Sequence, residues 1–541
     1  MAGHGAYEAV IVGAGFSGLY MLHKLRQLGV SARVIEAAPS VGGTWFWNRY
    51  PGARVDIESQ EYSYSFSPEL DEEWVWSERY ASQPELLKYL NHVADRFGLR
   101  GDIQLETRVT AAIYDEKARR WTLTTDRGET LTARYCVMAT GCLSVPKEGE
   151  FPGEANFKGP SWHTSRWPVE GVDFTGMTVA VIGTGSSAIQ SIPVIAEQAK
   201  HVTVFQRTPN FSVPAHNGPI DPAVAADWAA NRAAYRQEAR EAGFGIKGVA
   251  MGDTPALEAG PEQRRAAFEE RWKYGGFAFL GAYNDLILDL EANKTAAEFV
   301  ADKIREIVKD PATAEKLIPK TYPIGAKRLC VDTGYYATFN RPNVSLVDLS
   351  DEPIEDITES GVRTKAKDYA VDAIVYAIGF DAMTGALSKI DVRGRGGRRL
   401  SEAWAAGPRT YLGLMVAGFP NLFTVTGPGS PSVLCNMAVA IEQHVEWIAD
   451  CIAWMGERQM GAIEATEAAQ DAWVEHVNEV ADTTVYPLAN SWYLGANVPG
   501  KPRVFMPYIG GFPAYRDKCR EVAANGYEGF RVEPEGQSVP A

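Results

Sequence analysis

The sequence predicts an α/β fold that contains two units of the strand, glycine turn and helix type, about 170 residues apart. In the first unit the apolar run 9–12 (AVIV) leads into 13–18 (GAGFSG), and in the second 179–182 (VAVI) leads into 183–188 (GTGSSA). A third observation is the segment 217–332, which is rich in Ala, Glu, Arg and Lys at helical periodicity. We therefore expect two Rossmann-like dinucleotide-binding domains with a helical insertion.

The first unit is typical of a site for an unphosphorylated ribose. Its glycines allow a tight turn that leaves backbone N–H groups and a helix N-terminus open to a pyrophosphate. The β-type run 30–35 ends at Glu36, which lies 18 residues beyond Gly18. A carboxylate at this position accepts hydrogen bonds from a ribose 2′-OH and repels a 2′-phosphate. The first site therefore suits FAD or NAD.

The second unit has a different residue at the corresponding position. The strand-like run 201–205 leads into Arg207 and Thr208, so that an arginine stands where the acid would be. A guanidinium is permanently charged and binds phosphate through two hydrogen bonds, which suits the 2′-phosphate of NADPH. Two such units in one chain indicate two dinucleotides, one that delivers electrons and one that receives them.

The order of these units predicts how the domains follow along the chain. We expect the FAD-binding domain to occupy residues 1–145 and 381–541. The NADP-binding domain is expected at 146–216 and 333–380, interrupted by the helical insertion at 217–332.

Several elements are expected inside these domains. Strands are expected over 104–109, 120–125, 134–139 and 369–377, and helices over 223–241 and 295–308. Asp381 follows a glycine turn and is expected near the flavin end of the sheet, a plain turn aspartate being the alternative. The tail after Arg531 is expected to be disordered.

Composition excludes several classes of protein. The chain has 541 residues, 45% hydrophobic and 22% charged, which is ordinary for a soluble protein of more than one domain. Its net charge of −15 argues against nucleic acids and anionic membranes as partners. No run of 18 apolar residues suggests a membrane span, and the N-terminus leaves no room for a signal peptide before the first strand. We expect a cytoplasmic protein with no obligate protein partner.

The six cysteines contain no CxxC pair and no zinc spacing with histidines. A flavoprotein with two dinucleotide sites could be a disulfide reductase, but that chemistry needs a redox-active cysteine pair. The sequence lacks this pair, and no metal site is expected.

Two longer motifs identify a family. Residues 157–168 (FKGPSWHTSRWP) match FxGxxxHxxxW[PD] at Phe157, Gly159, His163 and Trp167, and residues 42–56 match [AG]GxWxxxx[FY]P[GM]xxxD. Both patterns are signatures of type I Baeyer–Villiger monooxygenases, which this chain resembles over nearly its whole length. It looks most similar to the phenylacetone and steroid monooxygenase branch.

The resemblance implies a mechanism. In this family NADPH reduces FAD, O₂ adds to give a C4a-peroxyflavin, and this attacks a ketone to form a tetrahedral adduct that rearranges to an ester or lactone. It implies that Arg328 stabilises the anions formed and that Asp56 orients Arg328. A surface ion pair is the alternative for Arg328, and a helix N-cap is the alternative for Asp56.

Other roles also follow from the resemblance. Lys327 is expected to join Arg207 and Thr208 around the 2′-phosphate, a solvent-facing lysine being the alternative. His163 is expected to transmit movement between domains, although a histidine invites assignment as a general base. Trp492 matches a family tryptophan on a mobile loop that covers the nicotinamide and substrate. The alternative for Trp492 is ordinary packing in the core.

The loop 428–437 matches the family's substrate-pocket loop, with Cys142 in a neighbouring variable position. The implied substrate is a hydrophobic ketone (aryl, cyclic or steroidal), with sulfoxidation as a side activity. Two other readings stay open: a flavin monooxygenase of sulfides or amines, and a non-enzymatic flavin-binding regulator.

The residues expected to contact FAD are Gly13, Gly15, Ser17, Gly18, Glu36, Thr44, Trp45, Trp47, Asp56, Tyr62, Val109 and Met437. Those expected to contact NADP are Arg54, Thr184, Gly185, Ser186, Ser187, Gln190, Arg207, Thr208, Lys327, Arg328 and Trp492. The ketone pocket is expected to be lined by Ser432, Val433, Leu434, Cys435 and Trp492.

Overall fold

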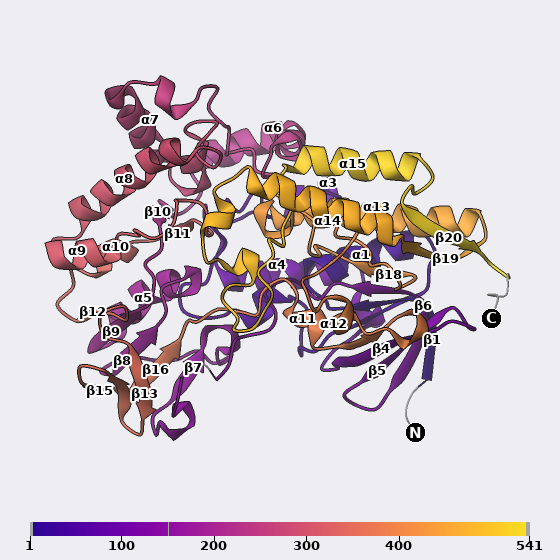
Figure 1. The fold of residues 1–541 in the computed structure, drawn as a ribbon, viewed down its shortest axis with the longest axis horizontal. Helices are drawn as coiled ribbons and strands as arrows, with labels where there is room; N and C mark the ends of the chain where they lie inside the picture. Colours follow the sequence, from indigo (N-terminus) through magenta and orange to yellow (C-terminus); the bar gives the residue numbers. More distant parts are fainter. Residues whose placement is uncertain (1–3, 150, 537–541) are drawn as a thin grey trace.

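The computed structural model describes residues 4–149 and 151–536 and confirms the α/β fold, with one mixed and one parallel sheet covered by helices (Figure 1). The strands of the first sheet are β1 His4–Val12, β2 Ala32–Ile35, β3 Ile103–Gln104, β4 Val109–Asp115, β5 Arg120–Thr125, β6 Thr130–Met138, β17 Asp391–Arg393 and β18 Leu422–Thr424. Their order is β17-β4-β5-β6-β1-β2-β3, with β18 beside β6. β1 is parallel to both β2 and β6, whereas β5 is antiparallel to its two neighbours.

The second sheet is parallel throughout. Its strands are β7 Ser161–His163, β8 Thr178–Ile182, β9 His201–Gln206, β12 Val344–Asp348 and β16 Ala373–Tyr376. They lie in the order β12-β9-β8-β16-β7. Parallel strands that are covered on both faces read as continuous apolar runs, which is why 179–182 was recognisable from the sequence.

The single strand expected over 369–377 is wrong. The chain forms β15 Asp368–Ala370 and then β16, and these strands lie in different sheets. β15 belongs to a small antiparallel sheet with β13 Ile354–Thr358 and β14 Gly361–Thr364. The break falls at Asp372, whose carboxylate accepts hydrogen bonds from the Thr178 backbone N–H (2.7 Å) and hydroxyl (2.6 Å). This local hydrogen bonding competes with a continuous ladder.

The strand expected over 104–109 is also wrong. β3 ends at Gln104 and β4 begins at Val109, and between them Glu106 has a φ of +52°. This left-handed conformation turns the chain and cannot occur inside a strand. The expected strand 120–125 is confirmed with the same bounds, and 134–139 falls largely within β6.

Helices begin directly after the two glycine turns. These are α1 Phe16–Gln27 and α5 Ser186–Gln198. Gly13 and Gly183 have φ values of +107° and +115°, and a Cβ on either would lie 2.5 or 2.4 Å from a backbone carbonyl oxygen of the neighbouring strand's end. Only glycine fits at both positions, because each combines a positive φ with this close approach.

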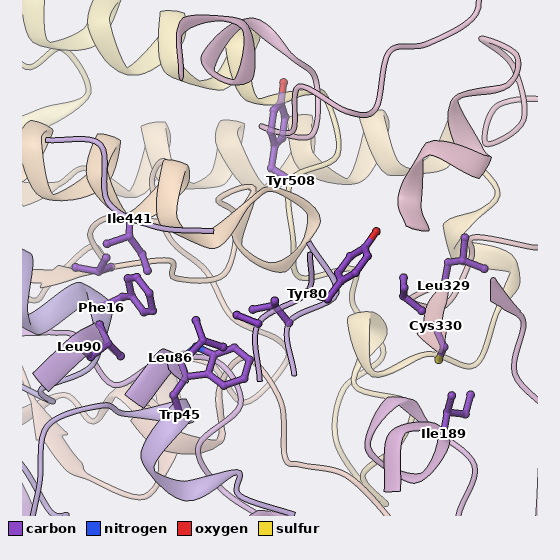
Figure 2. Close-up of a cluster of buried hydrophobic side chains, with 14 of the residues drawn as sticks. Phe16, Trp45, Tyr80, Leu86, Leu90, Ile189, Leu329, Cys330, Ile441 and Tyr508 are labelled. Atoms are coloured by element: carbon purple, nitrogen blue, oxygen red, sulfur yellow. The ribbon is translucent and has the colours of Figure 1, made fainter. Parts of the chain in front are cut away.

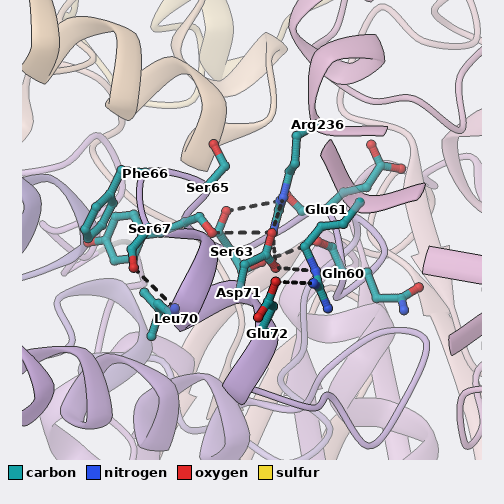
Figure 3. Close-up of polar contacts among 12 residues, drawn as sticks. Gln60, Glu61, Ser63, Ser65, Phe66, Ser67, Leu70, Asp71, Glu72 and Arg236 are labelled. Carbon is teal, nitrogen blue, oxygen red and sulfur yellow. Dashed lines mark hydrogen bonds and ion pairs between the residues drawn. The ribbon is translucent and has the colours of Figure 1, made fainter. Parts of the chain in front are cut away.

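The insertion is helical as expected. Its helices are α6 Pro222–Glu241, α7 Pro261–Tyr274, α8 Leu290–Ile307 and α9 Pro311–Leu317. Helix α6 is fixed to α3 (Pro68–Glu73) by the buried Arg236, which donates to both Asp71 oxygens (2.9 and 2.8 Å) and to the Ser63 hydroxyl (2.7 Å; Figure 3). Charged hydrogen bonds of this kind give the insertion a defined place on the first domain.

The last part of the chain covers the first sheet. Helices α13 Met437–Glu457, α14 Glu467–Asp482 and α15 Phe512–Ala524 lie along it (Figure 1). The disorder expected after Arg531 is wrong for the described residues. β20 Phe530–Pro534 pairs antiparallel with β19 Met460–Ala465, and Arg395 donates to both Glu464 (2.8 Å) and Glu533 (2.7 Å). Pairing with distant residues orders this polar segment; residues 537–541 lie outside the described part.

The remaining α-helices and strands complete the fold. They are α2 Thr44–Trp47, α4 Gln83–Arg96, α10 Tyr335–Thr338, α11 Gly385–Ser388, α12 Leu400–Ala403, β10 Ser212–Pro214 and β11 Cys330–Asp332. One hydrophobic cluster extends from Phe16 and Trp45 to Ile189 and Leu329 (Figure 2). Burying each such large side chain contributes about 1.5–3 kcal/mol, so this cluster stabilises the relative position of the two glycine turns. Among the described residues no helix is long and apolar enough to cross a membrane.

Candidate active site

A single cavity of about 1570 Å³ connects the two glycine turns. Gly13 and Gly15 of the first turn line it, Gly183 and Gly185 of the second turn line it, and so does Arg328. Dinucleotides bound at the two turns would therefore share one continuous cavity, as hydride transfer between them requires.

The first turn fits a flavin dinucleotide. A Cβ on Gly18 would lie 1.8 Å from the Gly13 carbonyl oxygen, so helix and strand approach as closely as the dinucleotide fingerprint requires. The Glu36 side chain is buried, and its carboxylate accepts from the Ala14 N–H (2.7 Å) and the Ala38 N–H (2.8 Å). Burial raises the pKa of Glu36, and these hydrogen bonds oppose the rise. The remaining lone pairs of the carboxylate suit ribose hydroxyls.

Nearly all the residues expected around FAD line the cavity. Every member of that set lines the cavity except Gly18, which packs beneath the turn. The Trp45 indole N–H donates to the Tyr62 hydroxyl over 3.4 Å, and burial raises the pKa of that hydroxyl. Asp381 also lines the cavity, where its carboxylate accepts from Lys501 (2.6 Å). It is thus more than a plain turn residue.

The second turn fits a phosphorylated dinucleotide. All the residues expected around NADP line the cavity. Burial, together with the positive charge of Arg207, lowers the pKa of Lys327 to about 8. Within the described residues neither side chain forms an ion pair with a carboxylate, so two cations share a place that lacks a counter-charge. A 2′-phosphate would supply the missing negative charge.

Arg328 and Asp56 form a two-point ion pair. Nε of Arg328 donates to Oδ2 of Asp56 (2.6 Å), one Nη donates to Oδ1 (2.8 Å), and the other Nη donates to the Val433 carbonyl (2.7 Å). Burial opposes the charge on Arg328, but attraction to Asp56 and the hydrogen bonds between them raise its pKa above the ordinary value. Asp56 caps no helix, because the described chain around it forms bends and turns. The N-cap alternative is therefore wrong.

His163 lies outside the cavity lining. Its Nδ1 accepts from the Ser165 N–H (3.2 Å) and contacts the Ser165 hydroxyl (2.5 Å). Burial, followed by the charge of Arg166, lowers its pKa to about 4. The ring is therefore neutral at physiological pH and lies at the end of β7, an edge strand of the second sheet. This placement suits the connector role rather than proton transfer at a ligand.

The rest of this motif is explained by packing. A Cβ on Gly159 would lie 2.5 Å from the Asp372 carbonyl oxygen, and Trp167 is buried against Trp162 and Phe174. Phe157 packs at the edge of the hydrophobic cluster of the second sheet.

The loop expected to form the ketone pocket has two faces. Val433 and Met437 line the cavity together with Cys142. Ser432, Leu434 and Cys435 are buried outside its lining, and Cys435 packs against Ala440 and Phe512. Alternate residues of a one-turn helix (η7, Ser432–Leu434) point in different directions, so a whole segment cannot face one pocket.

A second loop completes the wall beside Arg328. Trp492 lines the cavity from the turn η9 Trp492–Leu494, with its ring 4.3 Å from that of Tyr493. The loop is joined to residues 380–382 by Asn497, which donates to the Phe380 carbonyl, and by Lys501. Tyr493 and Lys501 were missed from the sequence, because their partners are distant along the chain. Adjacency to Trp492 was the only signal for Tyr493.

Comparison with known proteins agrees with this geometry. A family profile described as pyridine nucleotide-disulphide oxidoreductase matches residues 10–227. The described cysteines are all buried and unpaired, so disulfide chemistry does not follow from that match. The chain is 43% identical over 539 residues to the 2-oxo-Δ³-4,5,5-trimethylcyclopentenylacetyl-CoA monooxygenase of Pseudomonas putida, covering 97% of this chain and 98% of that protein.

Two further similarities are informative. The phenazine N-monooxygenase PhzNO1 of Lysobacter antibioticus is 42% identical, over 99% of this chain and 98% of its own. A solved structure described as oxidized steroid monooxygenase bound to NADP is 54% identical and superimposes with a TM-score of 0.94, covering 98% of this chain and 99% of that one. The shared fold, the two dinucleotide turns and these relatives identify a flavin-dependent enzyme that uses FAD and NADP. The chain belongs to the type I Baeyer–Villiger monooxygenase family.

Proposed function

We propose that this enzyme oxidises a hydrophobic ketone (aryl, cyclic or steroidal) to an ester or lactone, and that Arg328 stabilises the negative charge that develops on the carbonyl oxygen. The observation that carries this proposal is that Arg328 lines the cavity that connects the two dinucleotide turns. A guanidinium has five N–H donors, and three of them bond to Asp56 and Val433. The two that remain can stabilise an oxyanion, because the ion pair holds the group in a fixed orientation.

The other residues bind and orient. The N-termini of α1 and α5 bind pyrophosphates, Glu36 binds ribose hydroxyls, and Arg207 with Lys327 binds the 2′-phosphate. FAD, when bound and reduced by NADPH, supplies the reaction with O₂. Val433, Met437 and Trp492 give the cavity an apolar wall beside Arg328, which keeps water from the reacting groups.

Substrate size is argued from the wall and from the relatives. The Arg328 guanidinium carbon lies 5.0 Å from the centroid of the Phe277 ring. An apolar side chain therefore lies beside the charged group that is proposed to stabilise the oxyanion. The steroid monooxygenase that shares 54% of its residues with this chain supports a bulky ketone. Turnover of a graded panel (acetone, cyclohexanone, phenylacetone, progesterone) tests this. We expect kcat/KM to rise with apolar size, and preference for acetone would contradict the proposal.

A second candidate is oxygenation of a soft nucleophile, which the 42% identity to a phenazine N-monooxygenase supports. Sulfoxidation is proposed as a side activity of the same kind. The test compares phenylacetone with thioanisole and phenazine at equal concentration. A ketone kcat/KM more than tenfold above the others supports the main proposal, and the reverse order would place heteroatom oxygenation first.

A further inference from the structure

The middle of the motif 42–56 packs against helix α5, which begins at the second glycine turn. The Tyr50 hydroxyl donates to Oε1 of Gln190 (2.9 Å), and Nε2 of Gln190 donates to the Arg54 carbonyl (3.2 Å). A Cβ on Gly52, whose φ is +78°, would lie 2.3 Å from the Gln190 carbonyl oxygen. Three residues of one short segment therefore meet a single residue of α5, and Gln190 is only 6% exposed.

The amide of Gln190 can lie only one way round. The Arg54 carbonyl accepts hydrogen bonds but cannot donate them, so the amide nitrogen faces Arg54 and the amide oxygen faces Tyr50. A phenol hydroxyl donates only while it is protonated, and burial raises the pKa of Tyr50 above its ordinary value. The contact is therefore a hydrogen bond of fixed direction across the physiological pH range.

The segment that carries Tyr50 is fixed by backbone hydrogen bonds to the chain around it. The Ala53 N–H donates to the Tyr50 carbonyl (3.0 Å), and the Ala53 carbonyl accepts from the Gln83 N–H (2.8 Å) at the start of α4. The Val55 N–H donates to the Ala81 carbonyl (3.1 Å). These bonds give the Tyr50 hydroxyl a fixed starting point on its own side of the contact.

Gln190 occupies a position on α5 that faces the same cavity. It follows Ser186, the first residue of α5, by four positions, so the two side chains lie on the same face of the helix. Both residues line the cavity together with Gly185 and Tyr50. The N-terminus of α5 is the proposed site of the NADP pyrophosphate. The bond between Tyr50 and Gln190 therefore fixes that site relative to the motif 42–56, which also contributes residues to the expected FAD set.

The hydroxyl of Tyr50 is separable from its ring. The motif accepts either Phe or Tyr at this position, so the pattern requires only an aromatic ring here. The ring packs against the large hydrophobic cluster that contains Phe16 and Leu329, whereas the hydroxyl reaches across to α5. Removal of the hydroxyl alone should therefore leave the fold intact and test the bond itself.

We propose that Tyr50 is a positioning residue for the reduction of FAD. Through Gln190 it holds α5, and the NADPH bound at the N-terminus of α5, in place against the motif 42–56. The step concerned is transfer of a hydride from NADPH to oxidised FAD, which gives NADP⁺ and FADH⁻. The rate of such a transfer depends steeply on how the two reactants are aligned. The inference goes beyond the proposed function, because reduction of FAD precedes the reaction with the ketone.

The test compares Tyr50→Phe with Tyr515→Phe in the purified, FAD-containing enzyme. Tyr515 is fully buried in α15, donates to the Leu412 carbonyl (2.6 Å) and lies outside the cavity lining, so its variant loses a comparable hydrogen bond elsewhere. Anaerobic stopped-flow absorbance without ketone measures the rate of reduction at saturating NADPH. We expect this rate to fall about tenfold in Tyr50→Phe, because a small displacement of one reactant has a large effect. Tyr515→Phe should be reduced at the wild-type rate.

Binding measurements separate positioning from affinity. The groups proposed to bind the pyrophosphate and the 2′-phosphate are unchanged in Tyr50→Phe, so calorimetry should give a wild-type dissociation constant for NADP⁺. Reduction by saturating NADH should fall by the same factor as reduction by NADPH, since the 2′-phosphate is not involved. The long-wavelength charge-transfer absorbance of reduced flavin with NADP⁺ reports how closely the two rings approach. We expect it to be weaker in Tyr50→Phe and unchanged in Tyr515→Phe.

A double-mutant cycle tests whether Tyr50 acts through Gln190. Gln190→Met keeps the length of the side chain and removes its hydrogen bonds to Tyr50 and Arg54. The Tyr50 hydroxyl has then lost its acceptor, so the double variant should be reduced no more slowly than Gln190→Met alone.

Each result supports or overturns the proposal. A wild-type rate of reduction in Tyr50→Phe, an equal fall in Tyr515→Phe, or additive falls in the cycle would overturn it. So would an effect confined to the dissociation constant for NADP⁺, which would make Tyr50 a residue of affinity, or loss of FAD from Tyr50→Phe, which would make it purely structural. If the wild type made no ester from any ketone, the proposed function would fail, but the reduction measurements would still decide this inference.

Discussion

Arg328 and Asp56 are separated by 272 residues in the chain and form an ion pair with N···O distances of 2.6 and 2.8 Å. Each side chain is about three-quarters buried, with 23% and 24% exposed. A buried pair of this geometry is costly to break from one side, because the partner keeps a desolvated charge. It is therefore suited to fixing the direction of the arginine rather than to adding stability.

Removing the arginine separates flavin reduction from oxygen transfer. We expect Arg328→Ala to be reduced by NADPH and to form no ester, because its donors act on the developing oxyanion. Anaerobic stopped-flow absorbance measures the reduction, and gas chromatography measures the ester. A normal ester yield would remove Arg328 from the mechanism.

Asp56→Asn tests the orienting role. The amide keeps the shape of the side chain but loses the charge and one acceptor. We expect a fall in ester formation of about 10- to 100-fold with FAD retained, corresponding to about 1.4–3 kcal/mol lost from a charged hydrogen bond. The measurement is kcat with a saturating ketone. A wild-type rate of ester formation in Asp56→Asn would contradict the orienting role.

Substitution of Gly185 should affect ligand binding without affecting the fold. A Cβ at Gly185 would meet no atom within 4 Å, and its φ of −78° is ordinary for alanine. We expect Gly185→Ala to keep its melting temperature and its FAD but to bind NADP⁺ at least tenfold more weakly, because the methyl group would occupy the path of the pyrophosphate. Gly101→Ala, at an equally open surface position, is the matched control. Unchanged NADP⁺ affinity in Gly185→Ala would exclude this turn as the binding site.

The pKa of Lys327, near 8, predicts a pH dependence. The 2′-phosphate favours protonated Lys327, so the KM for NADPH should rise as the pH passes above about 8, whereas the KM for NADH should not. Lys327→Gln should abolish this rise. Because the charge of Arg207 contributes to lowering that pKa, Arg207→Gln should move the rise to higher pH while weakening NADPH binding overall. Parallel pH profiles for NADPH and NADH would contradict this assignment.

His163 predicts a stability change in acid. Its pKa is about 4 in the folded protein and about 6.5 when unfolded, so between these values the unfolded chain binds more protons. The His163 contribution is therefore present above pH 6.5 and is lost as the pH falls toward 4. We expect the melting temperature of the wild type to fall more steeply over this range than that of His163→Gln. Identical slopes would show that the pKa of His163 is the same in the folded and unfolded states.

The sequence predicted the parts of the site that lie within single local units. Both glycine turns, Glu36 and Arg207 follow strands whose apolar runs are readable, because parallel strands are buried on both faces. The pairing of Arg328 with Asp56 came from a family resemblance and not from spacing. The Val433 carbonyl, which accepts from Arg328, was not predictable, since a backbone acceptor carries no local signal.

The errors have a common cause. β20 was expected to be disordered because its residues are polar, yet it is ordered by pairing with β19 and by Arg395. The strand over 369–377 breaks at Asp372 because of its hydrogen bonds to Thr178. In both cases residues far away in the chain decide the local structure, and single-sequence patterns do not contain that information.

The most direct test of the central claim is whether an oxygen atom from O₂ enters the ester. The FAD-containing enzyme is reduced with NADPH without air and then exposed to ¹⁸O₂ with phenylacetone. We expect mass spectrometry to find one ¹⁸O atom in the ester. In a control with unlabelled O₂ and H₂¹⁸O, the ester should contain no ¹⁸O. Labelled hydrogen peroxide with no labelled ester from any ketone of the panel would contradict the account.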